Sequence, residues 1–385
     1  MRQGTARRDA GGSSVSPPLR VAHVSSVHQW TDNRVHYREC ASLADAGYDV
    51  TLIAVESPIE APMDRVRVIK LPRMNRALRA TWGSIRAVRL GLRSRAEVLH
   101  FHDPELAWAI PLCRLLGRKV IYDAHEDLPN QIRTKAYLPA PVMPLAVLTA
   151  HVVIALTRLS SHVVSATETI AHRYPSDRVS VVHNYPPLRD EESSARPVEE
   201  RGHTVVYIGT MSDSRGADVM VEAAGHPEFP SDWSFEIAGR ASDPLIERIS
   251  KLDGWNNTTF YGQVAPMTAR DLLLGCRVGL VLFEDSQAHR DALPTKMFEY
   301  FAAGVPVVAS DFPLWRTIIA EHECGLLVDQ TSPAAVAAAV RRYADDSDLL
   351  RRHSENARRL AEEKLNWSAE AETLIGVYAA IAPRS

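Results

Sequence analysis

The sequence predicts an α/β protein with two doubly wound parallel sheets, and two observations lead to this fold class. Short apolar runs rich in Val and Ile alternate with helical segments along most of the 385 residues, which is typical of strands and helices arranged around a parallel sheet. The alternation stops over Pro186–Gly202, which is rich in Pro, Glu, Arg and Ser, and starts again at Thr204. We therefore predict two domains of ordinary size joined by a linker at 186–202.

Composition narrows the class of protein. Hydrophobic residues make up 45% and charged residues 24% of the chain, as in soluble globular proteins, and a net charge of −3 argues against a dedicated nucleic-acid binder. The cysteines are scattered without C-x-x-C spacing, which fits a reducing cytoplasm better than a disulfide framework or a zinc site. Residues 1–18 lack an apolar core and are expected to be a disordered lead-in rather than a signal peptide.

In the first half, a helix over Asn33–Asp45 is predicted between the first two strands, with Asp32 at its start and Gly47 at its end. No G-x-G-x-x-G follows the first strand, which argues against a dinucleotide cofactor. The apolar runs of this half predict strands at Leu19–Ser25, Tyr48–Val55, Glu97–Phe101, Lys119–Tyr122, His162–Ala166 and Val179–His183.

Ligands of open α/β sheets gather at the carboxyl ends of the strands, so polar residues that follow strands are site candidates. His28 and Arg34 follow the first strand, and Arg34 could meet an anionic group or be an exposed helix arginine. His102 and Asp103 follow the strand that starts at Glu97. A cluster containing His125 and Glu126 follows the Lys119 strand, and a divalent metal is a minor alternative there.

Residues 65–95 contain ten Arg or Lys and no Asp or Glu. Arg79, Arg86 and Arg93 lie seven apart, which places them on one helical face beside an apolar stripe of Leu78, Trp82 and Ile85. A basic amphipathic helix can lie on an anionic membrane surface, and this is our hypothesis for the segment. A phosphorylated acceptor or a solvated arginine face are the alternatives.

The second half predicts strands at Thr204–Ile208, Phe235–Gly239, Val278–Phe283, Val305–Ala309 and Gly325–Asp329, and a strand followed by a loop within Thr258–Val264. Its most informative stretch is 291–311, in which a helix opens near Pro294 and stops at Gly304. The open amino end of such a helix favours a phosphate. Thr295 and Glu299 share one helical face and could hold two parts of a nucleotide, although an ordinary αβ unit with a surface Glu has the same spacing.

Asp291-x7-Glu299, followed by Ala-Ala-Gly-Val-Pro-Val-Val-Ala-Ser, resembles the E-x7-E signature of the retaining glycosyltransferases of family 4 (glycosyl transferases group 1). The resemblance implies the GT-B fold, in which two Rossmann-like domains face a cleft. It also implies that Asp291, here one methylene shorter than the family's Glu, holds the hydroxyls of the donor sugar. Glu299 would hold the ribose, and backbone N–H groups around Leu293, Pro294 and Thr295 would hold the diphosphate.

Other family positions match more loosely. His100-Phe-His102-Asp103-Pro resembles an H-x-H-[DE]-P segment whose second His approaches the donor sugar. The string around His125 and Glu126 resembles one that lies near the acceptor. In the loop after Gly209, the family uses two basic residues to clamp the diphosphate; Arg215 fits the second position, but Thr210 occupies the first. Arg240 or Lys296 could supply the missing charge. Gln263 and Val264 are the candidates for contact with the base.

The resemblance implies a hexosyltransferase-like enzyme that moves a sugar from a nucleotide-diphosphate sugar, UDP-sugars being favoured, to an acceptor hydroxyl with retention. It implies no metal and no cofactor besides this substrate. The acceptor would be a saccharide, a lipid-linked molecule or a small natural product, bound by residues 19–185. Residues 203–365 would bind the donor, and a last helix within 366–385 would cross back to the first domain.

Two rival functions and the cellular location complete the expectations. A nucleotide-sugar 2-epimerase-like isomerase of the same fold would share the donor grip but need no acceptor. A non-catalytic nucleotide-sugar-binding protein would explain the departures at Asp291 and Thr210. We expect no nucleic-acid partner and a cytoplasmic protein, with peripheral contact at the inner face of the membrane as the hypothesis for 65–95.

Overall fold

The computed structural model describes residues 18–57, 65–133, 141–189 and 196–382. The expected lead-in over 1–18 lies almost entirely outside the described residues, and so does the middle of the linker expected at 186–202. Two compact units can be distinguished in the described chain. One contains the residues up to Asp123 with 159–162 and those from Val377 onward, and the other contains 124–158 and 163–376.

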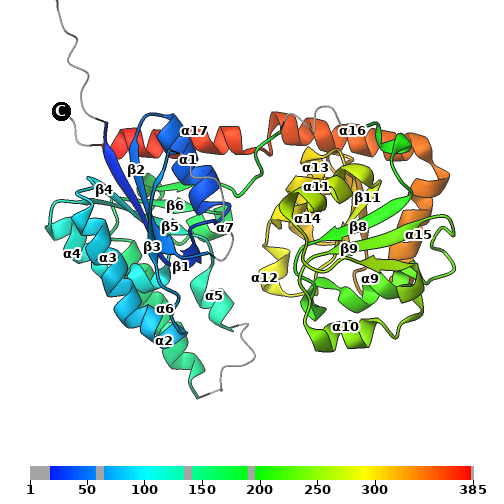
Figure 1. The fold of residues 1–385 in the computed structure, drawn as a ribbon, viewed down its shortest axis with the longest axis horizontal. Coiled ribbons are helices and arrows are strands. Elements are labelled where there is room, and N and C mark those ends of the chain that lie inside the picture. Colours follow the sequence, from blue (N-terminus) through cyan, green and yellow to red (C-terminus); the bar gives the residue numbers. More distant parts are fainter. Residues whose placement is uncertain (1–17, 58–64, 134–140, 190–195, 383–385) are drawn as a thin grey trace, which may run out of the picture. The chain divides into compact units, whose positions relative to one another are not determined.

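The first sheet has seven strands in the order β3-β2-β1-β4-β5-β6-β7 (Figure 1). The pairings that the structure records are parallel. Its order reverses between β1 and β4, which is the switch point where ligands bind in open α/β sheets. The strands are β1 Arg20–Gln29, β2 Asp49–Val55, β3 Arg67–Leu71, β4 Val98–Phe101, β5 Lys119–Ala124, β6 His162–Ser165 and β7 Val179–Val181.

One strand of this sheet was not predicted. β3 lies at the sheet edge and pairs with β2 through Val68 and Ile69, among other residues. Arg67 and Lys70 interrupt its apolar character within the arginine-rich segment, so the periodicity of a strand is weak there. Charged side chains are common on edge strands because they discourage pairing with other chains.

The helix predicted at Asn33–Asp45 begins as a π-helical segment and continues as α1. Asp32 caps it as expected, because its Oδ1 accepts hydrogen bonds from the backbone N–H groups of Arg34 and Val35 at 2.9 Å. The helical segments between the strands of the first sheet are η1 Val35–Cys40, α1 Ala41–Asp45, α2 Arg76–Leu78, η2 Arg79–Gly83, α3 Ser84–Arg93, η3 Pro104–Leu106, α4 Ala109–Leu115, α5 Leu128–Arg133, α6 Met143–Thr157, α7 Glu168–Ala171 and η4 Ser176–Arg178.

The second sheet has six parallel strands in the order β10-β9-β8-β11-β12-β13, again with a switch point, here between β8 and β11. Each predicted strand of this half is present. The strands are β8 Thr204–Ile208, β9 Ser234–Ala238, β10 Thr258–Phe260, β11 Val278–Val281, β12 Val307–Ser310 and β13 Gly325–Val328.

Two apolar cores lie in this half. One contains Phe235 and Val340, and the other contains Phe298 and Trp315. Strands that are covered on both faces explain why the sequence shows continuous Val and Ile runs instead of alternation. The helical segments are η5 Val198–Glu200, η6 Asp213–Arg215, α9 Ala217–Ala224, α10 Asp243–Ile249, η7 Asp253–Asn257, α11 Pro266–Gly275, α12 Gln287–Arg290, α13 Thr295–Ala302, α14 Pro313–Ile319, α15 Pro333–Asp345, α16 Ser347–Glu363 and α17 Trp367–Ile381.

The prediction of an α/β protein with two doubly wound parallel sheets is thus confirmed. Among the helices of the described residues, none is both long enough and apolar enough to cross a bilayer.

Candidate active site

Helix α13 has the form that its sequence predicts. Pro294 is its N-cap in an extended conformation, and no side chain of the described residues caps the first N–H groups of the helix. At the other end Gly304 has a φ of +62°, and the N–H groups of Gly304 and Val305 donate to the carbonyls of Phe301 and Tyr300. This Schellman arrangement needs a glycine, because other residues are strained at positive φ.

The loops that follow β8 and β9 approach each other closely. Gly209 and Gly239 have φ values of +135° and +152°. A Cβ at Gly239 would lie 1.9 Å from the carbonyl oxygen of Gly209, so only glycine fits. Gly209 was a predicted site residue. Gly239 was not, and its only signal in the sequence is a glycine directly after a buried strand.

Lys296, in the first turn of α13, is the least usual group of this half. Its side chain is only 9% exposed, and Nζ has no hydrogen-bond partner among the described residues. Nζ lies 3.6 Å from the ring centroid of Tyr207 and would lie 3.3 Å from a Cβ at Gly209. Burial and the nearby Arg215 guanidinium hold the pKa of Lys296 well below its ordinary value, while the charge of Glu299 opposes them.

Arg215 faces the same space from the loop after β8. Its Nη1 donates a hydrogen bond of 2.7 Å to the carbonyl of Thr210, and the Tyr207 hydroxyl donates to the same oxygen at 2.8 Å. Thr210 therefore contributes its backbone carbonyl to the arrangement. Gly209, Arg215 and Lys296 together are called the donor-side cluster below.

Arg240, the other candidate for the missing charge, is exposed, and its Nε donates to Gln263 Oε1 at 2.9 Å. The structure thus brings Arg240 and Gln263 together at the ends of β9 and β10. Val264 lies in the loop just beyond. Of the two candidates, Lys296 is the one in electrostatic contact with Arg215.

Asp291 ends the short helix α12, and Gln287 Nε2 donates to its Oδ2 at 2.7 Å. The loop from Asp291 to α13 is fixed on both sides. Trp315 Nε1 donates to the carbonyl of Ala292 at 2.8 Å, and Leu293 packs against an apolar core. Thr295 and Glu299 are both partly buried on α13. The predicted loop, helix and glycine stop are therefore confirmed as structure, while the roles of these residues stay predictions.

Asp103 fixes the end of β1. Its Oδ2 accepts hydrogen bonds from Ser25 Oγ at 2.9 Å and from the backbone N–H of Ser26 at 2.6 Å, and it does not cap the turn that follows it. His28 lies beside this carboxylate, with its Nδ1 3.2 Å from Asp32 Oδ2. Although burial opposes it, the hydrogen bond with Asp32 and the charge of Asp103 raise the pKa of His28.

Arg34 is buried, so the alternative of an exposed helix arginine is wrong. Its guanidinium forms ion pairs with Glu39 at 2.9 Å and with Asp123 at 3.1 Å, both of which are fully buried. The sequence around Arg34 does not predict this burial, because Asp123 lies 89 positions further along the chain. Burial and the charge of Asp123 raise the pKa of Glu39 well above its ordinary value, although Arg34 opposes them.

His102 is also buried, and both of its ring nitrogens are engaged. Nδ1 lies 3.1 Å from Asp123 Oδ2, and Nε2 lies 2.9 Å from His23 Nδ1. A direct contact with a sugar would require one of these bonds to open. His23 and His100 were not predicted as site residues; together with His102 they form the histidine cluster discussed below.

The residues that follow β5 differ in how exposed their side chains are. His125 is partly buried and Glu126 is exposed. Asp127 is committed to structure, because its Oδ2 forms an ion pair with Arg173 Nη2 at 2.7 Å and its Oδ1 accepts the backbone N–H of Asn130. Asp123 and Asp127 are thus held in ion pairs, and His125 and Glu126 stay the candidates of this string for the acceptor.

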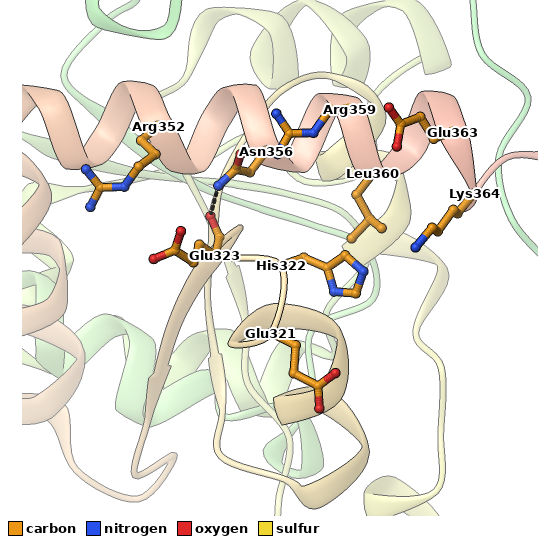
Figure 2. A pocket seen from close by; sticks show the side chains of 9 residues that line it. All are labelled: Glu321, His322, Glu323, Arg352, Asn356, Arg359, Leu360, Glu363 and Lys364. Carbon is orange, nitrogen blue, oxygen red and sulfur yellow. Dashed lines mark hydrogen bonds between the residues drawn. The ribbon is translucent and has the colours of Figure 1, made fainter.

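Figure 2 shows a pocket of about 290 Å³ between helix α16 and the turn before β13. Its lining includes Glu321, Glu323, Arg352 and Arg359. None of the predicted site residues lines it, so this pocket is separate from the candidate active site.

Two family models match the chain. The model for "Glycosyltransferase Family 4" matches residues 33–185, and the model for "Glycosyl transferases group 1" matches residues 189–360. Together they cover the two sheets described above except for β1.

Curated relatives are similar over part of their length. The chain is 28% identical over 191 residues to a phosphatidyl-myo-inositol mannosyltransferase of Mycobacterium leprae, covering 47% of each chain. It is 28% identical to a D-inositol 3-phosphate glycosyltransferase of Acidothermus cellulolyticus, over 46% of this chain and 41% of that one. An alpha-D-kanosaminyltransferase of Streptomyces kanamyceticus is 25% identical over 49% of this chain and 50% of its own. The chain thus spans about half the length of these relatives.

Solved structures match nearly the whole fold. Sucrose-phosphate synthase from Thermosynechococcus elongatus has a TM-score of 0.70 at 16% identity, covering 94% of this chain and 99% of that one. Anabaena HepE in complex with UDP and glucose has a TM-score of 0.70 at 11% identity, covering 94% and 100%. At such low identities these matches establish the fold, which is GT-B.

Proposed function

The chain belongs to glycosyltransferase family 4, and from this premise we propose that it transfers a sugar from a nucleotide-diphosphate sugar to an acceptor hydroxyl with retention of configuration. A UDP-sugar is the favoured donor. Retention and independence from metal follow the family's pattern. The relatives are transferases, which favours transfer over the isomerase and non-catalytic alternatives.

The diphosphate would bind at the amino end of α13. The backbone N–H groups of Leu293 and Thr295 would donate to it, together with the side chains of Arg215 and Lys296. Lys296 would replace the basic residue that is missing at Thr210. The support for this assignment is the buried Nζ without a partner next to Gly209, because a buried ammonium is costly unless an anion pairs with it.

The rest of the donor would extend along α13. Glu299, one turn deeper than Thr295, would accept hydrogen bonds from the ribose hydroxyls, and Asp291 would hold hydroxyls of the sugar. Arg240, paired with Gln263, would stand near the base together with Val264. As the sugar leaves, negative charge would build on the phosphate, and the fixed cations and N–H groups would stabilise it.

No pair of carboxylates is assigned as nucleophile and acid. Following the family, we propose that the departing phosphate takes the proton of the acceptor hydroxyl. Positioning then supplies much of the rate enhancement.

The acceptor would be bound by the first half of the chain, with His28, Arg34, Asp103, His125 and Glu126 as its candidate residues. Because Arg34 and Asp103 are buried and already paired, their contribution would be to hold the backbone next to them in place. His102 would act in the same way unless a bound sugar opens one of its hydrogen bonds. The acceptor class is a saccharide, a lipid-linked molecule or a small natural product.

Peripheral membrane contact through 65–95 remains part of the proposal. Trp82 is 69% exposed, and Leu78 and Ile85 beside it are exposed as well. Large apolar side chains next to arginines suit an anionic lipid surface, although Arg79 is paired with Glu105 at 3.1 Å. Co-sedimentation with anionic vesicles at low salt should recover the protein, and a Trp82→Ser variant should bind less. Equal recovery of both proteins would contradict the contact.

The observation that carries the proposal is the buried, unpartnered Lys296 beside the uncapped start of α13. A thermal-shift panel of UDP, GDP and their sugars tests it, because a ligand that binds the native state raises its stability by mass action. We expect one diphosphate series to raise Tm and the matching monophosphate to do so much less. If no nucleotide diphosphate shifts Tm, the donor assignment is wrong.

A further inference from the structure

The histidine cluster belongs to a continuous series of hydrogen bonds between buried groups from four parts of the sequence. His100 Nδ1 lies 2.8 Å from the Tyr378 hydroxyl, which lies 3.0 Å from His23 Nε2. His23 Nδ1 lies 2.9 Å from His102 Nε2, and His102 Nδ1 lies 3.1 Å from Asp123 Oδ2. Tyr378 comes from helix α17 near the end of the chain, whereas the histidines are on β1 and β4 and just beyond β4.

The chemistry of the groups fixes a single direction for these bonds. Asp123 carries a buried ion pair with Arg34, so its carboxylate accepts and His102 Nδ1–H donates. A neutral His102 then accepts at Nε2 from His23 Nδ1–H. His23 in turn accepts at Nε2 from the Tyr378 O–H, and the Tyr378 oxygen accepts from His100 Nδ1–H.

The His100 end of this series of hydrogen bonds agrees with the direction. His100 Nε2 is the remaining nitrogen, and it has no hydrogen-bond partner among the described residues. An unprotonated nitrogen is what the direction leaves there. Burial, followed by the neighbouring histidines, holds the pKa values of His23 and His100 well below their ordinary range, so both are neutral at physiological pH.

The charges of the groups around these hydrogen bonds balance without a histidine cation. Arg34 faces the carboxyls of Asp123 and Glu39, and the pKa of Glu39 is raised by burial and by the charge of Asp123. The positive charge of Arg34 therefore faces two buried carboxyls. Other titratable neighbours include His36 beside His23, His28 near His102, and Tyr48 and Cys40 near Tyr378.

We propose that Tyr378 is a positioning residue for the transferase site: its hydroxyl sets the tautomers of His23 and His102 and thereby holds Asp123, the last residue but one of β5, in a single arrangement. This inference rests on the proposed function, in which the residues after β5 contact the acceptor. Asp123 is followed directly by Ala124 and His125. A shift of Asp123 would therefore also shift the backbone of His125, a candidate acceptor residue.

One rival use of the same side chains is a metal site. Ligand atoms of His23, Glu39, His100 and His102 lie within 4.8 Å of one another. A divalent cation would need the nitrogen lone pairs and would displace the hydrogen bonds just described. The two uses are therefore exclusive, and each predicts a different result.

The first test needs no activity. In the full-length protein labelled with ¹⁵N-histidine, long-range ¹H–¹⁵N spectra at neutral pH should show His23, His100 and His102 as neutral Nδ1–H tautomers, the less common form of free histidine. About one equivalent of tightly bound zinc in the purified protein, or Nε2–H tautomers at these positions, would overturn the proposal. A missing transferase activity would sink the proposed function but leave this result intact.

The second test uses Tyr378→Phe, which removes one oxygen and keeps the ring. Tyr343→Phe is the matched control, because Tyr343 is equally buried and its hydroxyl lies 2.8 Å from His353 Nδ1, outside the histidine cluster. We expect Tyr378→Phe to change the His23 and His100 signals and to lower kcat about tenfold, a typical effect of losing a group that orients another. The KM for the nucleotide sugar selected by the panel should stay the same.

The control separates positioning from stability. Hydrolysis of the nucleotide sugar in water serves as the assay until an acceptor is known. Tyr343→Phe should lower Tm without changing kcat or the signals of the histidine cluster. If both variants lose stability and neither changes kcat, Tyr378 is structural only and the proposal is wrong.

Discussion

The donor-side cluster and the histidine cluster both contain buried polar groups, yet the two clusters differ in how their charged groups are paired. In the donor-side cluster, the Lys296 ammonium is buried and has no hydrogen-bond partner among the described residues. In the histidine cluster, a chain of hydrogen bonds ends on an ion pair between Asp123 and Arg34. In the first arrangement the Lys296 amino group has no hydrogen-bond partner among the described residues, whereas in the second the charges of Asp123 and Arg34 are paired with each other.

The difference separates binding from positioning. A buried amine without a hydrogen-bond partner either carries a costly charge or gives up its proton, and an anionic ligand lowers the free energy in both cases. A network whose charged groups are already paired gains little from a charged ligand, but it fixes geometry. The unpartnered group therefore marks where the donor binds, and the paired network marks what holds its surroundings in place.

The largest expected effect is that of Gly239→Ala, which tests whether the donor-side cluster depends on close approach of two loops. The new methyl group would meet the Gly209 carbonyl at 1.9 Å, so one loop must move. We expect the free energy of unfolding to fall by about 3 kcal/mol or more, measured by urea denaturation. Gly262→Ala is the control, because nothing lies within 4 Å of its Cβ, and it should cost only about 1 kcal/mol for its positive φ. Equal losses would contradict the account.

Lys296→Met should remove the cation while keeping most of the buried volume. A charged hydrogen bond contributes about 1.5–3 kcal/mol, so binding of UDP or GDP should weaken by up to about 100-fold in calorimetry. The variant should also be at least as stable as the original protein, because a buried ammonium without a partner has been removed. Lys251→Met changes an exposed lysine of the same half and should alter neither property. Unchanged nucleotide affinity in Lys296→Met would remove it from the donor site.

Glu299→Ala should weaken binding of the same nucleotides about tenfold, because hydrogen bonds from the ribose hydroxyls to the carboxylate are lost. Glu222→Ala, an exposed glutamate on α9, is the matched control and should bind normally. Affinity like that of the original protein for Glu299→Ala would leave the ribose without its proposed partner.

The smallest expected effect is a difference between His23 and His28 in how their protonation depends on pH. The pKa of His23 is lowered, mainly by burial. As pH falls below about 6.5, His23 therefore becomes protonated in the unfolded chain but stays neutral in the native state. Its contribution to the free energy of unfolding is therefore present above that pH and is lost below it. His28 has a raised pKa, because Asp32 and Asp103 outweigh its burial, and its contribution is present at low pH and lost as pH rises through that pKa. An NMR titration from pH 8 to 5.5 should show the His28 signals moving and the His23 signals fixed. Movement of both would contradict the assignment.

The fold was predictable because its signals are local. Apolar runs bounded by Gly and Pro marked twelve of the thirteen strands, and β3 was missed because Arg67 and Lys70 break its apolar character. Pro294 and Gly304 fixed the ends of α13 through backbone conformation alone.

The site was predictable only as far as motifs reach. The sequence singled out Glu299, Lys296 and Arg215, but burial and pairing depend on residues brought together from distant positions. Arg34 is buried by partners that include Asp123, 89 positions away, and Tyr378 lies 278 positions after His100. No spacing rule connects such residues, so the histidine cluster could not be foreseen.

Proton uptake on nucleotide binding tests the central claim most directly. The pKa of Lys296 is held well below its ordinary value by burial and by Arg215, and a bound diphosphate would raise it. Calorimetric titration of UDP or GDP at pH 8, in two buffers that differ in ionisation enthalpy, should show uptake of up to one proton, absent in Lys296→Met. Binding with no proton uptake, or with uptake that survives in Lys296→Met, would contradict the assignment of Lys296 to the diphosphate.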